Sequence, residues 1–215
     1  LIEVLEEVSK AKSNKLSKEK LLENLTKIEG IYVPKFYKPL EDFGKPYPFE
    51  KGICEKVRKR ISDMDVSNVP VQFPVPYLST VHDRAVIEIR RGCSRMCRFC
   101  QSCFVNLPVR DRKEEDIINL LERTLKNTGY DEYSLLSLSS SDYKNIESLV
   151  SVLNSTYSPE KISLSLPSQR ADAFSLNLAQ LVQSVRKSTL TFAPEAGSQR
   201  LRNVINKNLN EEQIL

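Results

Sequence analysis

From Arg84 onward, short apolar runs alternate with segments of helical periodicity, and this alternation limits the possible folds more than any other feature of the sequence. The expected strands are RAVIEI, EYSLLSLS, KISLSLPS and STLTFAP, of which the first is apolar enough to be buried on both faces. The expected helices are EEDIINLLERTLKNTG, NIESLVSVLNS, SLNLAQLVQSV and QRLRNVIN, because their apolar residues recur every three or four positions. Strands that alternate with helices predict right-handed βαβ units and a parallel sheet. Four such units exclude a closed eight-unit barrel for these residues alone.

The first 82 residues carry a weaker signal, and we expect them to form a helical and proline-rich connector. Residues 1–29 predict two helices, with Ser17 as the N-cap of the second and Gly30 at its end. Residues 31–82 contain most of the eleven prolines, which prevents a continuous helix and disfavours central strands. Within this stretch, residues 52–62 are a candidate strand. The sequence therefore predicts two parts, residues 1–82 and residues 83–215.

Four polar loops follow the four expected strands, and sheets of this kind bind ligands at the carboxyl ends of their strands. The segment RRGCSRMCRFCQSC follows the first strand, and SSSDY, PSQRADA and PEAGSQR follow the other three. We therefore expect one rim that gathers these loops into a site. This expectation does not depend on recognising any motif.

The first loop contains four of the five cysteines, and three kinds of site compete for them: a disulfide, a zinc site and an iron-sulfur cluster. Clustered cysteines in a chain of this size do not resemble a secreted disulfide framework, so we expect reduced thiols and a cytoplasmic protein. Structural zinc sites usually take two ligand pairs from separated segments, whereas these cysteines lie in one short run. A cluster with four thiolates usually belongs to a small cysteine-rich fold. Both remain alternatives to a cluster held by three cysteines.

The spacing of Cys93, Cys97 and Cys100 is C-x3-C-x2-C, with an aromatic residue just before the last thiol. Three thiolates hold three irons of a four-iron cluster and leave the fourth iron open to a small ligand. Four neighbouring arginines favour thiolate over thiol and offset the negative charge of the cluster: Arg90, Arg91, Arg95 and Arg98. Gly92 allows a sharp turn out of the strand into the loop.

The pattern C-x3-C-x-aromatic-C after the first strand of a βα repeat resembles the radical S-adenosylmethionine (radical SAM) superfamily. The resemblance implies an α/β fold, namely a partial (β/α)6 radical SAM barrel that here is truncated after about four βα units. It also implies a [4Fe-4S] cluster whose open iron binds the amino and carboxylate groups of S-adenosylmethionine. Reduction then cleaves this cofactor to a 5′-deoxyadenosyl radical.

Four segments are similar to a radical SAM subgroup whose barrel follows a cobalamin-binding-like domain: VHDRAVIEIRRGCSRMCRFC, LLSLSSSDY, SLPSQRADAFS and TFAPEAGSQRLRNVINK. The substrate of that subgroup is unassigned. We expect residues 1–82 to follow such a domain upstream of Leu1, and residues 83–215 to form a radical SAM core that is incomplete at its C-terminus. The cobalamin signature D-x-H-x-x-G does not occur around His82.

The resemblance also assigns roles on the four loops. Three residues would hold the cluster: Cys93, Cys97 and Cys100. Eight residues would contact S-adenosylmethionine: Phe99, Ser139, Ser140, Asp142, Arg170, Glu195, Gly197 and Lys207. The ammonium would lie at Ser139, Ser140 and Asp142. The ribose would lie at Glu195, and the carboxylate at Lys207 or Arg170. Phe99 would lie against the adenine, and Gly197 would let the backbone approach the adenosine.

Ordinary alternatives stand beside these roles. Asp142 is also a candidate cap of the next helix, Phe99 a core residue, Gly197 a plain loop glycine and Lys207 a solvated lysine. Cys103 would not be a cluster ligand, because a fourth thiolate would block the cofactor. Cys103 and Cys54 are instead expected to be small buried residues.

We therefore predict a radical SAM enzyme that abstracts hydrogen from a substrate or transfers a methyl or methylthio group to it, through cobalamin if the upstream domain is functional. A flavodoxin or ferredoxin would supply the electron, and RNA and protein are the candidate substrate classes. The alternative from another class is a non-catalytic iron-sulfur module for electron transfer or binding. The basic run KVRKR predicts a solvated face, since aspartates follow it and no aromatic residues interleave with it. No apolar run is long enough to span a membrane.

Overall fold

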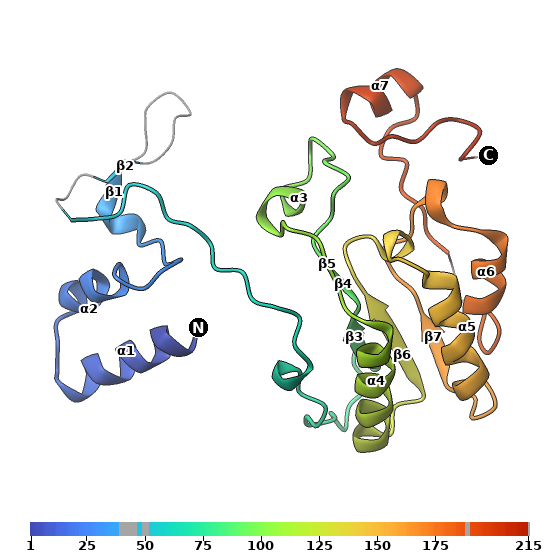
Figure 1. Ribbon diagram of the computed structural model, residues 1–215, viewed down its shortest axis with the longest axis horizontal. Coiled ribbons are helices and arrows are strands. Elements are labelled where there is room, and N and C mark those ends of the chain that lie inside the picture. The colour runs from blue at the N-terminus through green and yellow to red at the C-terminus, as the bar shows by residue number, and fades with distance from the viewer. Residues whose placement is uncertain (39–46, 49–51, 188–189, 215) are drawn as a thin grey trace. The chain divides into compact units, whose positions relative to one another are not determined.

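The computed structural model describes residues 1–38, 47–48, 52–187 and 190–214 (Figure 1). The chain divides into two compact units, Leu1–Ser62 and Asp63–Leu215. The first unit contains both predicted helices, α1 (Ile2–Ser13) and α2 (Lys18–Leu25). The hydroxyl of Ser17 accepts a hydrogen bond from the Lys20 N–H, so the predicted N-cap of α2 is confirmed.

The remainder of the first unit has little regular structure. A 3-10 helix (Pro34–Phe36) leads into β1 (Tyr37–Lys38), which pairs antiparallel with β2 (Tyr47–Pro48). The strand considered for residues 52–62 is wrong, because these residues form turns and bends and contain no strand. They are mostly exposed, five of the eleven are charged, and only Ile53 and Val57 among them pack against the small core of this unit. Cys54 is exposed, so its prediction as a buried residue is also wrong.

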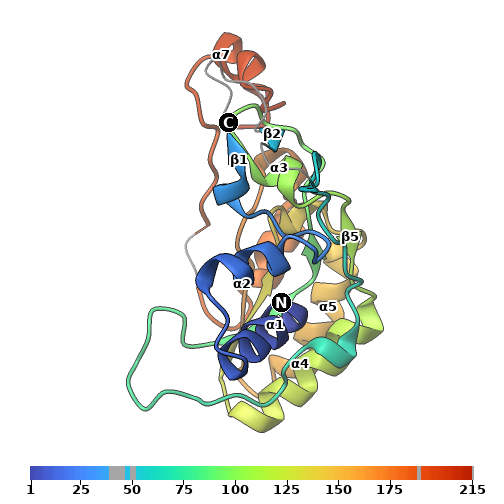
Figure 2. The same ribbon diagram turned by 90° about the vertical axis from the view of Figure 1, so that its left-hand side faces the viewer.

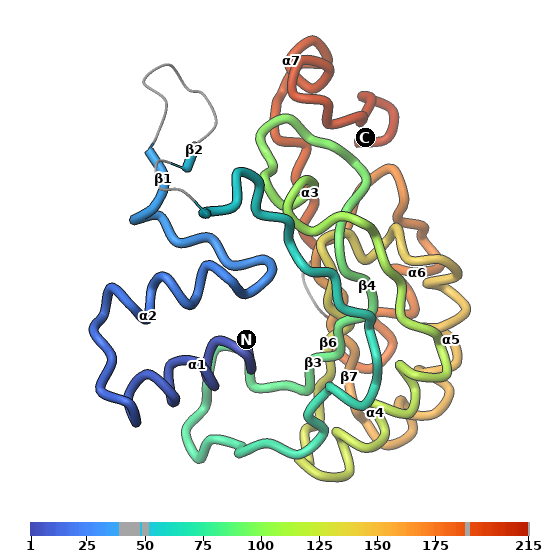
Figure 3. The backbone as a smooth tube through the Cα atoms, turned by 60° about the vertical axis from the view of Figure 1, so that its left-hand side comes forward, coloured from blue at the N-terminus to red at the C-terminus, as the bar shows by residue number. Residues whose placement is uncertain are grey.

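The second unit is built on a parallel sheet of three strands in the order β3–β6–β7. These strands are β3 (Ala85–Glu88), β6 (Glu132–Leu136) and β7 (Ser163–Ser165). Three helices follow them in the chain: α4 (Glu114–Thr128), α5 (Ile146–Tyr157) and α6 (Leu176–Val182). Figures 1 and 3 show these helices along one side of the sheet, where the main core lies. The predicted order of three strands and three helices is confirmed.

The alternation of buried and exposed residues in the strands shows which face the helices cover. In β3, Ala85 and Ile87 are buried, whereas Val86 is 44% exposed. Leu136 and Leu138 are exposed to a similar extent at the end of β6. The expectation that β3 is buried on both faces is therefore wrong. Three strands do not close a barrel.

The fourth predicted strand, STLTFAP, falls partly on Ser188 and Thr189, which lie outside the described residues. The rest of it is wrong, because residues 190–194 pair with no strand. Phe192 instead packs edge-to-face against Phe174, with ring centroids 5.2 Å apart. The predicted fourth helix follows as α7 (Gln199–Val204), whose N-cap Ser198 accepts a hydrogen bond from the Leu201 N–H. None of the helices in the described ranges is both long and apolar enough to cross a membrane.

Candidate functional site

The cysteine loop is an excursion of the chain between β3 and α4. Two short strands, β4 (Arg90–Arg91) and β5 (Arg110–Asp111), pair antiparallel and close the loop at its base. Figures 1 and 2 show the short helix α3 (Ser102–Val105), which is part of this loop, at the same end of the second unit as α7. The predicted turn at Gly92 is confirmed, with φ at +90°. A Cβ on Gly92 would lie 2.6 Å from the carbonyl oxygen of Asn106, so only glycine fits there.

The three cysteines of the C-x3-C-x2-C motif are free thiols on this loop. Cys93 and Cys100 are partly exposed, and Cys97 is 8% exposed. The fourth cysteine of the loop, Cys103, is buried as predicted, and its Sγ donates to the carbonyl oxygen of Cys100 at 2.8 Å. Burial raises the pKa of the Cys103 thiol, with Cys100 and Cys93 contributing. Cys103 is thus turned toward the backbone and stays protonated more readily than an exposed thiol.

These donors suit an iron-sulfur cluster better than a single metal ion. Within the described ranges, no three side chains of Cys, His, Asp or Glu are grouped to hold one ion. A structural zinc ion gathers all its sulfur ligands around one centre, whereas each iron of a four-iron cluster takes its own thiolate. Three reduced thiols spread along one loop fit the second arrangement.

Most arginines of the loop form ion pairs with carboxylates of the protein. Three of them form ion pairs with carboxylates: Arg90 with Asp111, Arg91 with Glu88, and Arg95 with both Asp142 and Asp172. Arg98 donates to the carbonyl oxygen of Val204 and forms no ion pair among the described residues. Carboxylates of the protein therefore balance much of the charge of three of these arginines, while Arg95 also interacts with Cys93.

The loop after β6 contains Ser139, Ser140 and Asp142, with a 3-10 helix at Ser140–Asp142. Both serines are buried, and the hydroxyl of Ser139 donates to Asp142 Oδ2 at 2.7 Å. Burial raises the pKa of the Asp142 carboxyl, but hydrogen bonds from Arg95 and Ser139 lower it more, so the net pKa lies below its ordinary value. Asp142 is therefore a carboxylate at neutral pH.

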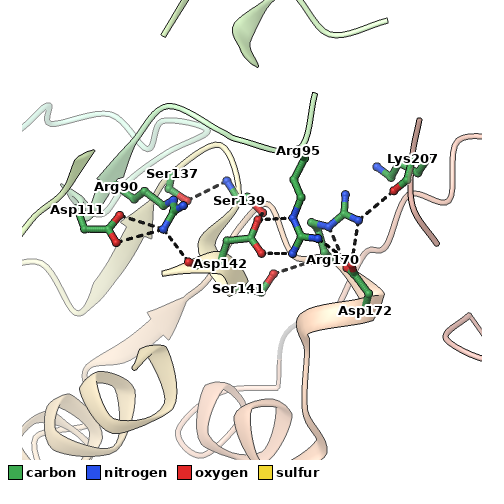
Figure 4. A network of polar contacts seen from close by, with 10 residues as sticks. All are labelled: Arg90, Arg95, Asp111, Ser137, Ser139, Ser141, Asp142, Arg170, Asp172 and Lys207. Carbon is green, nitrogen blue, oxygen red and sulfur yellow. Dashed lines mark hydrogen bonds and ion pairs between the residues drawn. The ribbon is translucent and has the colours of Figure 1, made fainter. Parts of the chain in front are cut away.

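The helix-cap alternative for Asp142 is wrong. Helix α5 has Asn145 as its N-cap residue, in the left-handed conformation, and no side chain caps its first turn. The Asp142 carboxylate points instead to Arg95 and Ser139 (Figure 4). Asp142 therefore contacts residues of the loops at the end of the sheet and does not cap helix α5.

Arg170 follows β7 and is 7% exposed. Its guanidinium donates to both carboxylate oxygens of Asp172, at 2.9 and 3.0 Å, and to the carbonyl oxygen of Lys207 at 3.0 Å. Its backbone N–H donates to the Ser141 hydroxyl, which joins the loop after β7 to the loop after β6. Figure 4 shows the resulting chain of contacts across the rim.

Glu195 and Lys207, twelve residues apart, meet in the structure. Lys207 Nζ donates to Glu195 Oε1 at 3.4 Å, and the Lys207 side chain is 12% exposed, so the solvated alternative is wrong for Lys207. Nothing lies within 4 Å of a Cβ built on Gly197, which leaves open space beside its backbone. Phe99 is 55% exposed, so the core alternative is wrong for Phe99.

Sequence reasoning missed the centre of this rim. It treated Arg95 as a charge beside the thiols and did not single out Asp172, yet these two residues join Asp142 to Arg170 (Figure 4). The only signal was their position, since Arg95 lies inside the cysteine motif and Asp172 two residues after Arg170. No periodicity connects residues that are 77 positions apart.

Comparisons with known proteins place these observations in a family. The family model of the radical SAM superfamily matches residues 87–215. An uncharacterized protein of Methanocaldococcus jannaschii is 33% identical over 151 residues, which are 70% of this chain and 32% of that protein. A tRNA-2-methylthio-N(6)-dimethylallyladenosine synthase of Staphylococcus epidermidis is 36% identical over 76 residues, which are 35% of this chain and 15% of the synthase. The chain thus spans about a third or less of the length of these relatives.

Proposed function

The chain belongs to the radical SAM superfamily, and from this premise we propose that Cys93, Cys97 and Cys100 hold the [4Fe-4S] cluster with which it cleaves S-adenosylmethionine. Membership of the family implies the cluster and the cofactor. The observation that supports the ligand assignment is the arrangement of the four thiols. Cys93 and Cys100 are partly exposed on the loop at the end of β3, and Cys97 is 8% exposed. The fourth thiol, Cys103, is 1% exposed, and its Sγ donates to the backbone carbonyl of Cys100.

The bound cluster supplies one electron for the cleavage, and the surrounding residues bind and orient the cofactor. Asp142 stays ionised and can accept hydrogen bonds from the cofactor ammonium, beside the short side chains of Ser139 and Ser140. Because both serines are buried, they would act mainly by shaping the loop around Asp142. A carboxylate of this kind holds an amine in one position.

The carboxylate and ribose of the cofactor would lie at the other end of the rim. Arg170 and Lys207 meet there, since the guanidinium donates to the Lys207 carbonyl. The Lys207 ammonium has three donors and uses one on Glu195, which leaves N–H groups for a ligand carboxylate. Glu195 would accept hydrogen bonds from the ribose hydroxyls, and the open backbone at Gly197 and the exposed ring of Phe99 would receive the adenosine.

The group that is transferred and the class of substrate are proposed from a shorter region of similarity. Transfer of a methylthio or methyl group is supported by the 76-residue similarity to a synthase whose name states a 2-methylthio product on tRNA. RNA is therefore the favoured substrate class over protein. The use of cobalamin stays a prediction from the subgroup resemblance. A flavodoxin or ferredoxin as electron donor and a reducing, cytoplasmic setting would suit the cluster and the free thiols.

Anaerobic reconstitution with iron and sulfide tests the proposal. We expect about four irons per chain and an electron paramagnetic resonance spectrum of the reduced protein that changes when S-adenosylmethionine is added. Reduction should also release 5′-deoxyadenosine. A spectrum that does not change when S-adenosylmethionine is added would favour the electron-transfer module. One tightly held zinc ion per chain would favour a structural zinc site.

Two cysteine variants provide the matched comparison. Cys97→Ala should lose most of the iron, because it removes one of three ligands. Cys103→Ala should keep it, because that sulfur already donates to the Cys100 carbonyl. A large loss of iron in Cys103→Ala, with normal iron in Cys97→Ala, would overturn the ligand assignment.

A further inference from the structure

The three cysteines of the motif lie in the part of the loop that has no regular structure. Residues 92–101 contain neither helix nor strand, so contacts with other segments help to hold the thiols in position. Arg95, between Cys93 and Cys97, makes such contacts in two directions. Its guanidinium donates to both oxygens of Asp142 and to Asp172 Oδ2 at 3.1 Å (Figure 4).

Both acceptors are themselves held in place. The side chains of Asp142 and Asp172 are 13% and 9% exposed, so they meet the arginine in a partly dry environment. The Ser139 hydroxyl holds Asp142, and the Arg170 guanidinium holds Asp172 through two hydrogen bonds. A planar guanidinium can serve two carboxylates in fixed directions, which a lysine ammonium cannot do as well. Arg95 therefore docks onto a preformed pair of acceptors.

The balance of charge indicates what this contact does. Arg95 and Arg170 carry two positive charges, and Asp142 and Asp172 carry two negative charges, so the four side chains are neutral together. Two carboxylates therefore balance most of the positive charge of Arg95, although the charge still interacts with Cys93. The contacts of its guanidinium suggest a geometric effect, which the variants below separate from a charge effect.

The backbone beside Arg95 is held from a second element. The Asn206 side-chain amide donates to the carbonyl oxygen of Met96 at 2.8 Å and to that of Arg95 at 3.3 Å. The Arg98 N–H donates to the carbonyl oxygen of Ile205. The side chain of Arg95 thus anchors the loop to the segments after β6 and β7, while the segment after α7 holds its backbone.

We propose that Arg95 is a positioning residue, which sets the spacing of Cys93 and Cys97 and fixes the cysteine loop against the segments that carry Asp142 and Arg170. This inference rests on the proposed function, in which these cysteines hold the cluster and those segments hold the cofactor. It gives the arginine inside the cysteine motif a role through its neighbours rather than through contact with the reacting atoms.

The test compares two arginine variants that remove the same charge. Arg95→Gln breaks the contacts with Asp142 and Asp172, whereas Arg91→Gln breaks only a local pair with Glu88. Iron loss from the reconstituted proteins to a chelator is the first readout. Residues that orient metal ligands typically change metal affinity about 10- to 100-fold, so we expect Arg95→Gln to lose iron at least about tenfold faster. Arg91→Gln should stay within about twofold of the unmodified protein.

Hydrogen exchange of the iron-free proteins is the second readout, and it does not need the cluster. Amides of residues 93–101 should exchange faster in Arg95→Gln than in Arg91→Gln, while amides of α4 and α5 stay unchanged. Arg95→Lys keeps the charge but loses the planar fork, so it should restore only part of the protection and part of the iron retention. Full rescue by lysine would show a charge effect and overturn the inference.

The outcomes separate this inference from the function on which it rests. If the unmodified protein takes up no cluster, the proposed function fails, and hydrogen exchange still decides whether Arg95 orders the loop. If the unmodified protein takes up the cluster, and Arg95→Gln and Arg91→Gln lose iron at the same rate, the positioning role is wrong. Should Arg95→Gln fail to fold, Asp172→Asn replaces it, since that variant keeps the Arg95–Asp142 contact and should still speed iron loss.

Discussion

The helix-covered face of the sheet and the rim at the ends of its strands are held together by different interactions. Behind the sheet, side chains from β3, β6, α4 and α5 form a continuous apolar cluster, with Ile117, Leu135 and Leu149 fully buried. At the rim, the contacts are ion pairs and hydrogen bonds between loops, such as Arg95 with Asp142 and Arg170 with Asp172. The first region is fixed by burial and the second by polar geometry.

This difference separates stability from activity. A fully buried leucine contributes about 1.5–3 kcal/mol by leaving water, whereas a partly exposed ion pair such as Arg91–Glu88 contributes about 0–1 kcal/mol. Removing one partner of a buried pair such as Arg170–Asp172 costs more, because it leaves the other charge unpaired. Changes behind the sheet should therefore destabilise the unit, and changes at the more exposed rim positions should leave it folded but misplace its polar groups. Substitutions in each region can break or sharpen this comparison.

The largest effect is expected from Leu149→Ala in α5. Leu149 is fully buried in the main core, and removing its side chain leaves a cavity in addition to the lost burial. Such substitutions cost about 2–5 kcal/mol. Urea unfolding followed by circular dichroism should show this loss as a lower midpoint with little change in slope.

Val152→Ala is the matched control on the same helix. Val152 is 46% exposed, so its truncation should change the free energy of unfolding by less than about 0.5 kcal/mol. Equal losses in the two variants would mean that α5 does not pack on the sheet through the face that contains Leu149.

A rim residue with an effect on stability is Gly92, where Gly92→Ala should cost about 2–4 kcal/mol. Its φ of +90° is unfavourable for alanine, and the new Cβ would lie 2.6 Å from the Asn106 carbonyl oxygen. The loop must then shift, so iron retention after reconstitution should fall as well. Urea unfolding and iron analysis measure the two effects.

Gly129→Ala isolates the contribution of the contact. Gly129 also has a positive φ, +73°, but nothing lies within 4 Å of its Cβ position. It should therefore show only the backbone cost of about 1 kcal/mol, and iron retention should not change. If both variants lose the same stability and the same iron, the close approach of Asn106 does not limit position 92.

The same comparison explains which parts of the structure the sequence could predict. The helices and three of the strands have local signatures, because apolar periodicity and caps such as Ser17 and Ser198 lie within the element they define. The fourth run had the same apolar signature and still forms no strand in its described residues. A strand needs a paired neighbour, and periodicity alone does not provide one.

The rim was predictable in its place but not in its contacts. The order of strands and loops indicated that the segments with Asp142 and Arg170 come together, and the family resemblance added Lys207. The structure joins these residues in one network. Their actual partners depend on residues 37 to 77 positions away, such as Asp172 for Arg95 and the Lys207 carbonyl for Arg170. Rotamers and hydrogen-bond geometry choose among many acceptors, so charge patterns in the sequence do not identify these pairs.

The smallest effect is expected where the core itself contains a polar group. Tyr133 is fully buried against Tyr157, and in the described part of the chain its hydroxyl has no hydrogen-bond partner. Tyr133→Phe removes a hydroxyl that loses its hydrogen bonds to water on folding and gains none in the protein. We expect it to leave the free energy of unfolding at pH 7 unchanged or to raise it by up to about 1 kcal/mol. Tyr143→Phe should instead cost about 1 kcal/mol, because that hydroxyl donates to the Arg112 carbonyl oxygen at 2.7 Å.

Alkaline pH sharpens the contrast between these two tyrosines and the rest of the core. Burial raises the pKa of the Tyr133 hydroxyl well above its usual value of 10 and the pKa of Tyr143 to about 12. Above pH 10 the unfolded chain loses these protons and the folded chain keeps them, so stability falls as pH rises, by up to about 1.4 kcal/mol per pH unit for each group. Tyr133→Phe should remove one such contribution, and urea unfolding between pH 9 and pH 11 measures it as a shallower decline. An unchanged decline would show that the Tyr133 hydroxyl reaches water in the folded state.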